Sequence, residues 1–250
     1  MRTLLFIIFS FLILHTKAQT FKDGEWLKYR IHYGLINAGY ATIKLDEIKK
    51  DNQPAFHVTG NGWTVGVTKF FFKVEDNYET WFYKNNMKPY HFKRRVDEGG
   101  YIISRDIYFD YNKNLATVHD HKKDEKKEIA IQDVQDMISC FYYLRTKDFG
   151  SLDVGESFHV DMFFDYESFP FKMKYLGMET INTKYGKMKC YKFIPLVQSG
   201  RVFEADESVT VWVTADKNKI PIRIQASLVV GSLKADLDEY KGLANPLVNN

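Results

Sequence analysis

Apolar and polar side chains alternate along residues 25–45, EWLKYRIHYGLINAGYATIKL. Successive side chains of a strand point to opposite faces, so this alternation places two apolar sets on one face. The first set is Leu27, Tyr29, Ile31 and Tyr33, and the second is Ala41, Ile43 and Leu45. The segment GLINAG between them is typical of a turn. The pattern therefore predicts a β-hairpin with one apolar and one polar face.

Similar patterns continue along most of the chain. Short segments rich in β-branched and aromatic residues are separated by Asn, Gly, Pro or Asp. Examples are AFHVTGNG, TKFFFKV, NYETWFYK, KPYHFKRRV and YIISRDIYFDY in the first half, and SFHVDMFFDY and GKMKCYKFIPLV in the second. About a dozen or more short strands at nearly even spacing indicate a mainly β protein. We expect a curled antiparallel sheet in the form of a barrel, a roll or a sandwich.

One segment, IQDVQDMISCFYYLRTKDFG, follows a helical period instead. Its apolar residues recur at the spacing i, i+3, i+4, i+7 and are Val134, Met137, Ile138, Phe141 and Leu144. Asp133 can cap the start, and Arg145 and Lys147 lie at the negative end of the helix dipole. We predict one packed helix from Asp133 to Thr146, between two β-rich halves, and no second helix.

The first 18 residues have the features of a signal peptide. Arg2 supplies a positive charge, and Leu4 to Leu14 form an apolar run too short to span a bilayer. Thr16 and Ala18 are small residues at the expected cleavage site, and no cysteine follows the run to carry a lipid anchor. We expect an exported mature chain, residues 19–250, in the periplasm or on the envelope, without a transmembrane segment. It forms a single β-rich domain or two β-rich halves joined by the helix.

Charge and cysteine content exclude two classes of protein. The chain has 35 Lys and Arg against 32 Asp and Glu, and two of the basic residues lie in the signal peptide, so the mature chain is nearly neutral. Such a chain lacks the basic surface that binds nucleic acid. Two cysteines, Cys140 and Cys190, do not make a disulfide scaffold. We expect both to be buried, reduced thiols rather than a bridge.

Three parts of the chain resemble one known family. GEWLKYRIHYGLINAGYATIKL resembles the opening strands of the family of unknown function numbered 3108, DVQDMISCFYYLRT resembles its helix, and VTVWVTADKNKIPIRIQASLVVGSLKADL resembles its closing strands. The matches cover most of residues 24–237. The resemblance implies an exported, mainly β protein of the Gram-negative envelope. It supplies no substrate, cofactor or catalytic residue, and no role for Cys140.

No catalytic motif stands out along the chain. It has no Gly-x-Ser-x-Gly elbow, no His-Glu-x-x-His zinc helix and no phosphate-binding glycine loop, and GNGWTVGV fits a bend between strands. His119 and His121 share one face of a strand and are weak metal-ligand candidates. Acidic pairs are plentiful but lie mostly at turns. We therefore assign no catalytic residue, no metal and no cofactor, and favour a protein that is not an enzyme.

Several segments are apolar on both faces, which is typical of strands that are sandwiched or border a cavity. An ordinary core would explain this pattern, and so would a pocket for an apolar molecule. If a pocket exists, we expect one wall made of Tyr29, Ile31, Tyr33, Ile43, Phe70, Phe72, Trp81, Met137 and Phe141. The first hypothesis is a binding protein for an apolar ligand such as a lipid. The second is an accessory protein that docks on an envelope partner through an aromatic surface, and the third is a hydrolase with an unrecognised acidic pair.

Overall fold

The computed structural model describes residues 19–196, 209–228 and 230–248. The predicted signal peptide lies outside these residues. Fourteen strands form the described structure: β1(Glu25–Tyr33), β2(Ile36–Lys50), β3(Gln53–Thr64), β4(Glu75–Tyr83), β5(Pro89–Glu98), β6(Tyr101–Asp110), β7(Leu115–Asp120), β8(Glu125–Ala130), β9(Ser157–Phe164), β10(Glu167–Thr183), β11(Gly186–Leu196), β12(Val209–Thr214), β13(Pro221–Ser227) and β14(Ser232–Lys241). Two helices are present among the described residues, α1(Gly66–Phe71) and α2(Met137–Arg145).

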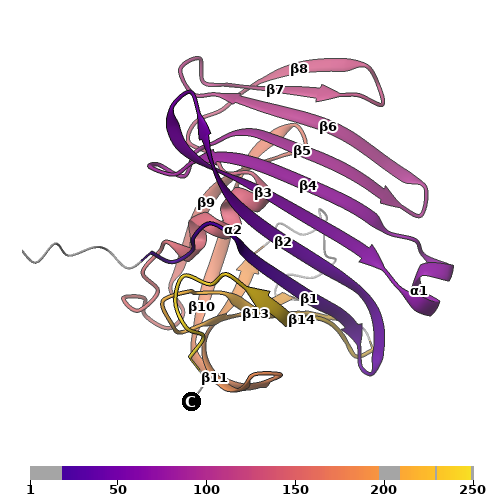
Figure 1. The fold of residues 1–250 in the computed structure, drawn as a ribbon, viewed down its shortest axis with the longest axis vertical. Helices are drawn as coiled ribbons and strands as arrows, with labels where there is room; N and C mark the ends of the chain where they lie inside the picture. The colour runs from indigo at the N-terminus through magenta and orange to yellow at the C-terminus, as the bar shows by residue number, and fades with distance from the viewer. Residues whose placement is uncertain (1–18, 197–208, 229, 249–250) are drawn as a thin grey trace, which may run out of the picture.

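All fourteen strands belong to one antiparallel sheet. Its order is β8-β7-β6-β5-β4-β3-β2-β1-β14-β13-β12-β11-β10-β9, so the first and last strands of the chain pair at its centre. The sheet twists and curls around α2 (Figure 1), as the right-handed twist of strands favours. The predicted fold class, a curled and mainly antiparallel β-sheet with a packed helix, is confirmed.

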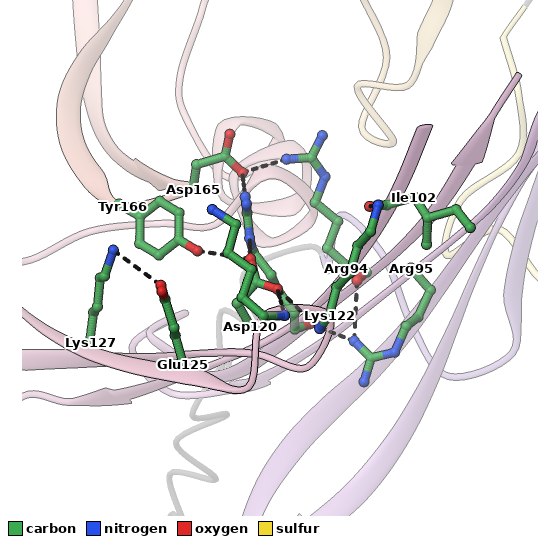
Figure 2. A network of polar contacts seen from close by, with 11 residues as sticks. Arg94, Arg95, Ile102, Asp120, Lys122, Glu125, Lys127, Asp165 and Tyr166 are labelled. Atoms are coloured by element: carbon green, nitrogen blue, oxygen red, sulfur yellow. Dashed lines mark hydrogen bonds and ion pairs between the residues drawn. The ribbon is translucent and has the colours of Figure 1, made fainter. Parts of the chain in front are cut away.

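The edge strands β8 and β9, at the two ends of the sheet, are not paired with each other. Side chains instead join the end of the sheet that contains β9 to the end that contains β8. Asp165, in the β9–β10 turn, accepts hydrogen bonds from Arg94 at 2.5 Å and from Arg105 at 2.6 Å. Asp120 accepts from Arg105 and from the Tyr166 hydroxyl, both at 2.9 Å. Figure 2 shows this network, which we call the latch. It fastens the β9–β10 turn to β5, β6 and β7.

The helix α2 begins three residues later than the sequence predicts. Asp136, not Asp133, is the N-cap: its carboxylate accepts from the backbone N–H groups of Ile138 and Ser139, both at 2.8 Å. The Ser139 hydroxyl accepts from the N–H of Asp136 in return, which completes a capping box. Asp133 is exposed and pairs with Lys88 instead. Satisfying these otherwise unpaired N–H groups fixes the start of the helix.

The expectation of a single helix is wrong, because TKFFFKV forms α1 and its flank rather than a strand. Gly66 at φ +54 turns the chain out of β3, a conformation that glycine adopts without strain. Three consecutive phenylalanines have no period, so their pattern could not distinguish a strand from a helix. None of the residues of α1 is buried.

A buried ion pair fixes α2 against the centre of the sheet. Arg145, at the end of α2, donates to both carboxylate oxygens of Glu25, with Nη1–Oε1 at 2.5 Å and Nη2–Oε2 at 2.8 Å. Its Nε also donates to the carbonyl of Asn218 at 3.0 Å. Both charged side chains are almost fully buried, and the rings of Phe21 and Tyr142 pack on the guanidinium. The contact joins α2 to β1 and to the β12–β13 connection.

Cys140 and Cys190 are both buried and free, as predicted. Burial raises the pKa of each thiol, which keeps both protonated near neutral pH. Among the described residues, neither helix is long and apolar enough to cross a bilayer.

Candidate functional site

The structure brings together only part of the predicted pocket wall. Tyr29 and Ile43 are buried in the main core, and Phe141 packs against that core from α2. Met137 packs in two neighbouring clusters, around Val134 and around Met162. These residues therefore contribute to the hydrophobic cores between α2 and the sheet.

The predicted hairpin of β1 and β2 is present, but its apolar face does not run to the tip. Leu27 and Tyr29 are buried, whereas Ile31 is half-buried and Tyr33 is exposed. The register with β2 shifts between Ile31 and His32, and His32 is buried instead. The extra residue at this shift is Ala38 on β2, while the pairing of β1 with β14 continues without a shift from Tyr29 to Tyr33. The faces of β1 are therefore not exchanged: Ile31 and Tyr33 share the face of Leu27 and Tyr29 but are less buried toward the tip of the hairpin.

Three further predicted wall residues lie away from this core. Phe70 and Phe72 are 87% and 51% exposed at α1, so the expectation that they face an interior is wrong. Trp81 stacks between His57 and His91, with ring centroids at 4.3 Å and 4.5 Å. Its neighbours on β4, Thr80 and Phe82, are fully buried, so Trp81 lies on the other face of the strand.

An apolar cavity of about 60 Å³ lies between α2 and strands β9 to β13. Nine of its lining residues are apolar: Phe141, Leu144, Phe149, Phe158, Met173, Phe193, Val211, Val213 and Pro221. The two charged residues at this cavity are Arg145 and Lys219. Phe141 is the one member of the predicted wall that lines it. We call this space the α2 cavity.

Lys219 supplies a cationic group at the α2 cavity. Its ammonium donates to the carbonyl of Lys147 and lies 5.6 Å from the centre of the Phe149 ring. Burial lowers the pKa of Lys219, and this ammonium has no ion pair with a carboxylate in the described part of the chain. Arg145, by contrast, is neutralised by Glu25. Lys219 is therefore the charge at this cavity that an anionic group could approach.

A second, open groove of about 560 Å³ lies near the ends of β3 to β6, where Trp63, Ile102 and Asp76 are among its lining residues. Burial, with the neighbouring Glu98, raises the pKa of Asp76 to about 6. Its Oδ1 accepts from the N–H of Asp97 at 3.2 Å. Asp76 is therefore an acidic residue that lines a groove and has a clearly raised pKa.

The two candidate metal ligands, His119 and His121, do lie together, with ring centroids 4.0 Å apart. His121, however, contacts the carboxylate of Asp106, which Arg95 also binds at 3.1 Å through both oxygens. No group of three or more metal-ligating side chains occurs in residues 19–196, 209–228 and 230–248. The structure therefore adds no third ligand to the pair.

Sequence reasoning missed most of the α2 cavity and its lysine. The lining side chains come from five strands, the helix and two loops, so no local spacing joins them. The signal within reach is TADKNKIP, whose Asp, Asn and Pro are typical of a hairpin connection and which contains Lys219. Nothing in the segment indicates that this one lysine folds back onto an apolar cavity.

Comparisons with known proteins support the fold and one family. The sequence model of the family described as "Protein of unknown function (DUF3108)" matches residues 28–238. None of the curated proteins is similar enough to count as a relative. A β-barrel-like protein of another family of unknown function, DUF1849, from Brucella abortus has the same fold: the TM-score is 0.60 at 8% identity, over 88% of this chain and 98% of that one.

Two further solved structures have lower scores. A hypothetical protein from Chlamydia trachomatis aligns with a TM-score of 0.38 at 7% identity, covering 92% of this chain and 94% of that chain. An exported-protein candidate with a YmcC-like fold from Bacteroides fragilis aligns with a TM-score of 0.37 at 8% identity, covering 88% and 97%.

Proposed function

The chain belongs to DUF3108, a family of proteins of unknown function, and within that family we propose that it is an exported envelope protein that binds an apolar ligand in its curled sheet. The α2 cavity is the observation that carries this proposal. Its lining is apolar except for Arg145 and Lys219. Ligand sites of this kind combine apolar walls with a few polar groups that set the orientation. Export rests on the predicted signal peptide.

The chemistry of the cavity favours an acyl chain with an anionic head, such as a fatty acid. The acyl chain would pack against the apolar walls. The ammonium of Lys219 would donate hydrogen bonds to the anionic head without displacing an existing ion pair. A volume of about 60 Å³ is well below the roughly 300–1,000 Å³ of a pocket for a drug-sized molecule. A long chain therefore enters only as lining side chains move, and Met173 has the flexible side chain suited to this.

Binding of a fluorescent long-chain fatty acid tests the proposal. We expect Lys219→Gln to weaken binding about tenfold, equivalent to about 1.4 kcal/mol, because the head loses its cation. Lys217→Gln is the matched control, since Lys217 lies in the same connection but is exposed. Val213→Phe, which fills the cavity, should reduce uptake of the chain. Equal binding by the wild type and all three variants would refute the site.

One observation supports each of the other two hypotheses. Docking on an envelope partner is supported by the exposed phenylalanines of α1. A hydrolase is supported by Asp76, whose raised pKa suits a general acid. Ligand binding remains the first proposal because the α2 cavity combines apolar walls with a cation that has no ion pair in the described part of the chain.

A further inference from the structure

One edge of the sheet has five described hairpin connections in a row, and four of them carry exposed apolar side chains. The fifth, residues 121–124 between β7 and β8, is polar. In the order of the sheet, β6–β5, β4–β3, β2–β1 and β14–β13 are consecutive pairs. Their connections are residues 99–100, 65–74 and 34–35 and, in the described part of the last, residues 228 and 230–231, and all four turn at the same edge because the strands are antiparallel. In Figure 1 this edge lies on the right, where α1 projects beyond the ends of the strands. We call it the α1 edge.

Each of the four hairpins exposes large apolar side chains at this edge. Leu35 is 100% exposed, Phe70 87%, Val230 73% and Tyr101 62%. Most of the exposed large apolar residues among the described ones lie at or beside these four connections. A monomer rarely leaves apolar side chains exposed on several neighbouring segments without a partner surface.

Folding does not require these side chains to be apolar. The six residues of α1 include none that is buried, and Phe70 and Phe71 pack against each other at 5.5 Å. The opposite edge shows what a solvated edge of this sheet looks like. Its connections 51–52, 84–88, 111–114 and 215–220 contain mainly Asn, Asp and Lys. The four connections therefore differ in chemistry from those of the opposite edge.

The charges of the α1 edge indicate what covers it. The four connections contain two ionisable residues that are charged at neutral pH, Lys69 and Lys73, and no acidic residue. Both lysines are about half exposed and flank the three phenylalanines. Glu75, at the start of β4, pairs with both, and Asp97 on β5 also pairs with Lys73 at 3.5 Å, so two carboxylates offset these two lysines. The neighbouring β7–β8 connection supplies further cations at this edge, Lys122 and Lys123. Apolar side chains flanked by lysines are suited to an anionic bilayer surface.

We propose that the α1 edge docks on an anionic lipid bilayer, with the four hairpin tips dipping into the interface. A bilayer fits better than a folded partner because the tips present aromatic and aliphatic side chains of different size on separate connections. A fluid interface accepts such tips without shape complementarity, which a protein surface would need. This proposal goes beyond ligand binding and does not depend on the α2 cavity.

Flotation of the mature chain with vesicles tests the proposal. The vesicles contain phosphatidylethanolamine with phosphatidylglycerol, or phosphatidylcholine alone. We expect the protein to float with the anionic vesicles, less at high salt, and at least tenfold less after Phe70→Gln/Phe71→Gln. The control Val154→Gln/Met178→Gln also removes two exposed apolar side chains, but away from this edge. It should float like the wild type.

Three results would overturn the proposal. The first is wild-type protein that floats with neither kind of vesicle. The second is equal flotation by the two double variants. The third is a wild type that self-associates in solution through the same phenylalanines, with Phe70→Gln/Phe71→Gln monomeric, since a second copy would then cover the edge. Val213→Phe, which fills the α2 cavity, should float normally, so failure of ligand binding and failure of docking are distinguishable.

Discussion

Replacing Glu25 by Gln tests whether the buried ion pair holds α2 in place. The change leaves the Arg145 guanidinium buried without its counter-charge, while the carbonyl of Asn218 remains as a hydrogen-bond acceptor. Removing one partner of a buried pair costs about 3–5 kcal/mol, because the remaining charge cannot be solvated. That is a large share of the 5–15 kcal/mol by which a typical protein is stable.

Urea unfolding followed by tryptophan fluorescence measures this cost. With a denaturant slope of about 2–3 kcal/mol/M, the midpoint should fall by roughly 1–2 M. The matched control is Glu239→Gln, which breaks the exposed pair with Lys28 at 2.8 Å; exposed pairs contribute little, so its midpoint should barely move. The double variant Glu25→Leu/Arg145→Met, which removes both charges, should regain much of the loss. A loss below about 1 kcal/mol for Glu25→Gln would refute the reasoning.

Three further predictions concern the cap, the latch and the groove. Asp136→Ala should lower the free energy of unfolding by about 2 kcal/mol. This is at the upper end for an N-cap, because the Thr80 hydroxyl also donates to the Asp136 carboxylate at 2.5 Å. Asp133→Ala should change the thermal midpoint little. Burial alone would raise the pKa of Asp120, but hydrogen bonds from Arg105 and Tyr166 lower it to about 2. Stability should therefore fall as the pH drops from about 4 to about 2, by about 1 kcal/mol after screening, and Asp120→Asn should remove this dependence in acid titrations. The pKa of Asp76 is raised to about 6, so its titration should lower the free energy of unfolding by about 1 kcal/mol as the pH rises from 4 to 6. A shallower fall for Asp76→Asn than for the wild type checks this, since burial also raises the pKa of Asp136 to about 6 and that group titrates in both proteins.

The period of the sequence predicts the sheet well, because alternation reports directly which positions face a core. It predicts the hairpin of β1 and β2 and the segment of α2. It fails at Ile31 and Tyr33, which share the apolar face but are less buried toward the hairpin tip, and at Phe70 to Phe72, where three like residues have no period. The start of α2 was misjudged for a different reason: Asp133 and Asp136 are equally good caps by type, and the contact with Thr80 on β4 is tertiary.

The candidate site was much less predictable than the fold. Arg94 and Asp165 of the latch are 71 residues apart, and Glu25 and Arg145 are 120 apart. Pairing at such distances depends on how the sheet curls, which no local pattern specifies. The same holds for Lys219, which differs from the exposed Lys217 only in where the fold places it.

The proposed binding of an apolar ligand is tested most directly by native mass spectrometry of the chain purified from its own envelope. We expect a single added mass, that of one fatty acid or other acyl-chain ligand, which is lost in Val213→Phe and reduced in Lys219→Gln. The bare chain mass, or added mass from bound protein alone, would contradict it.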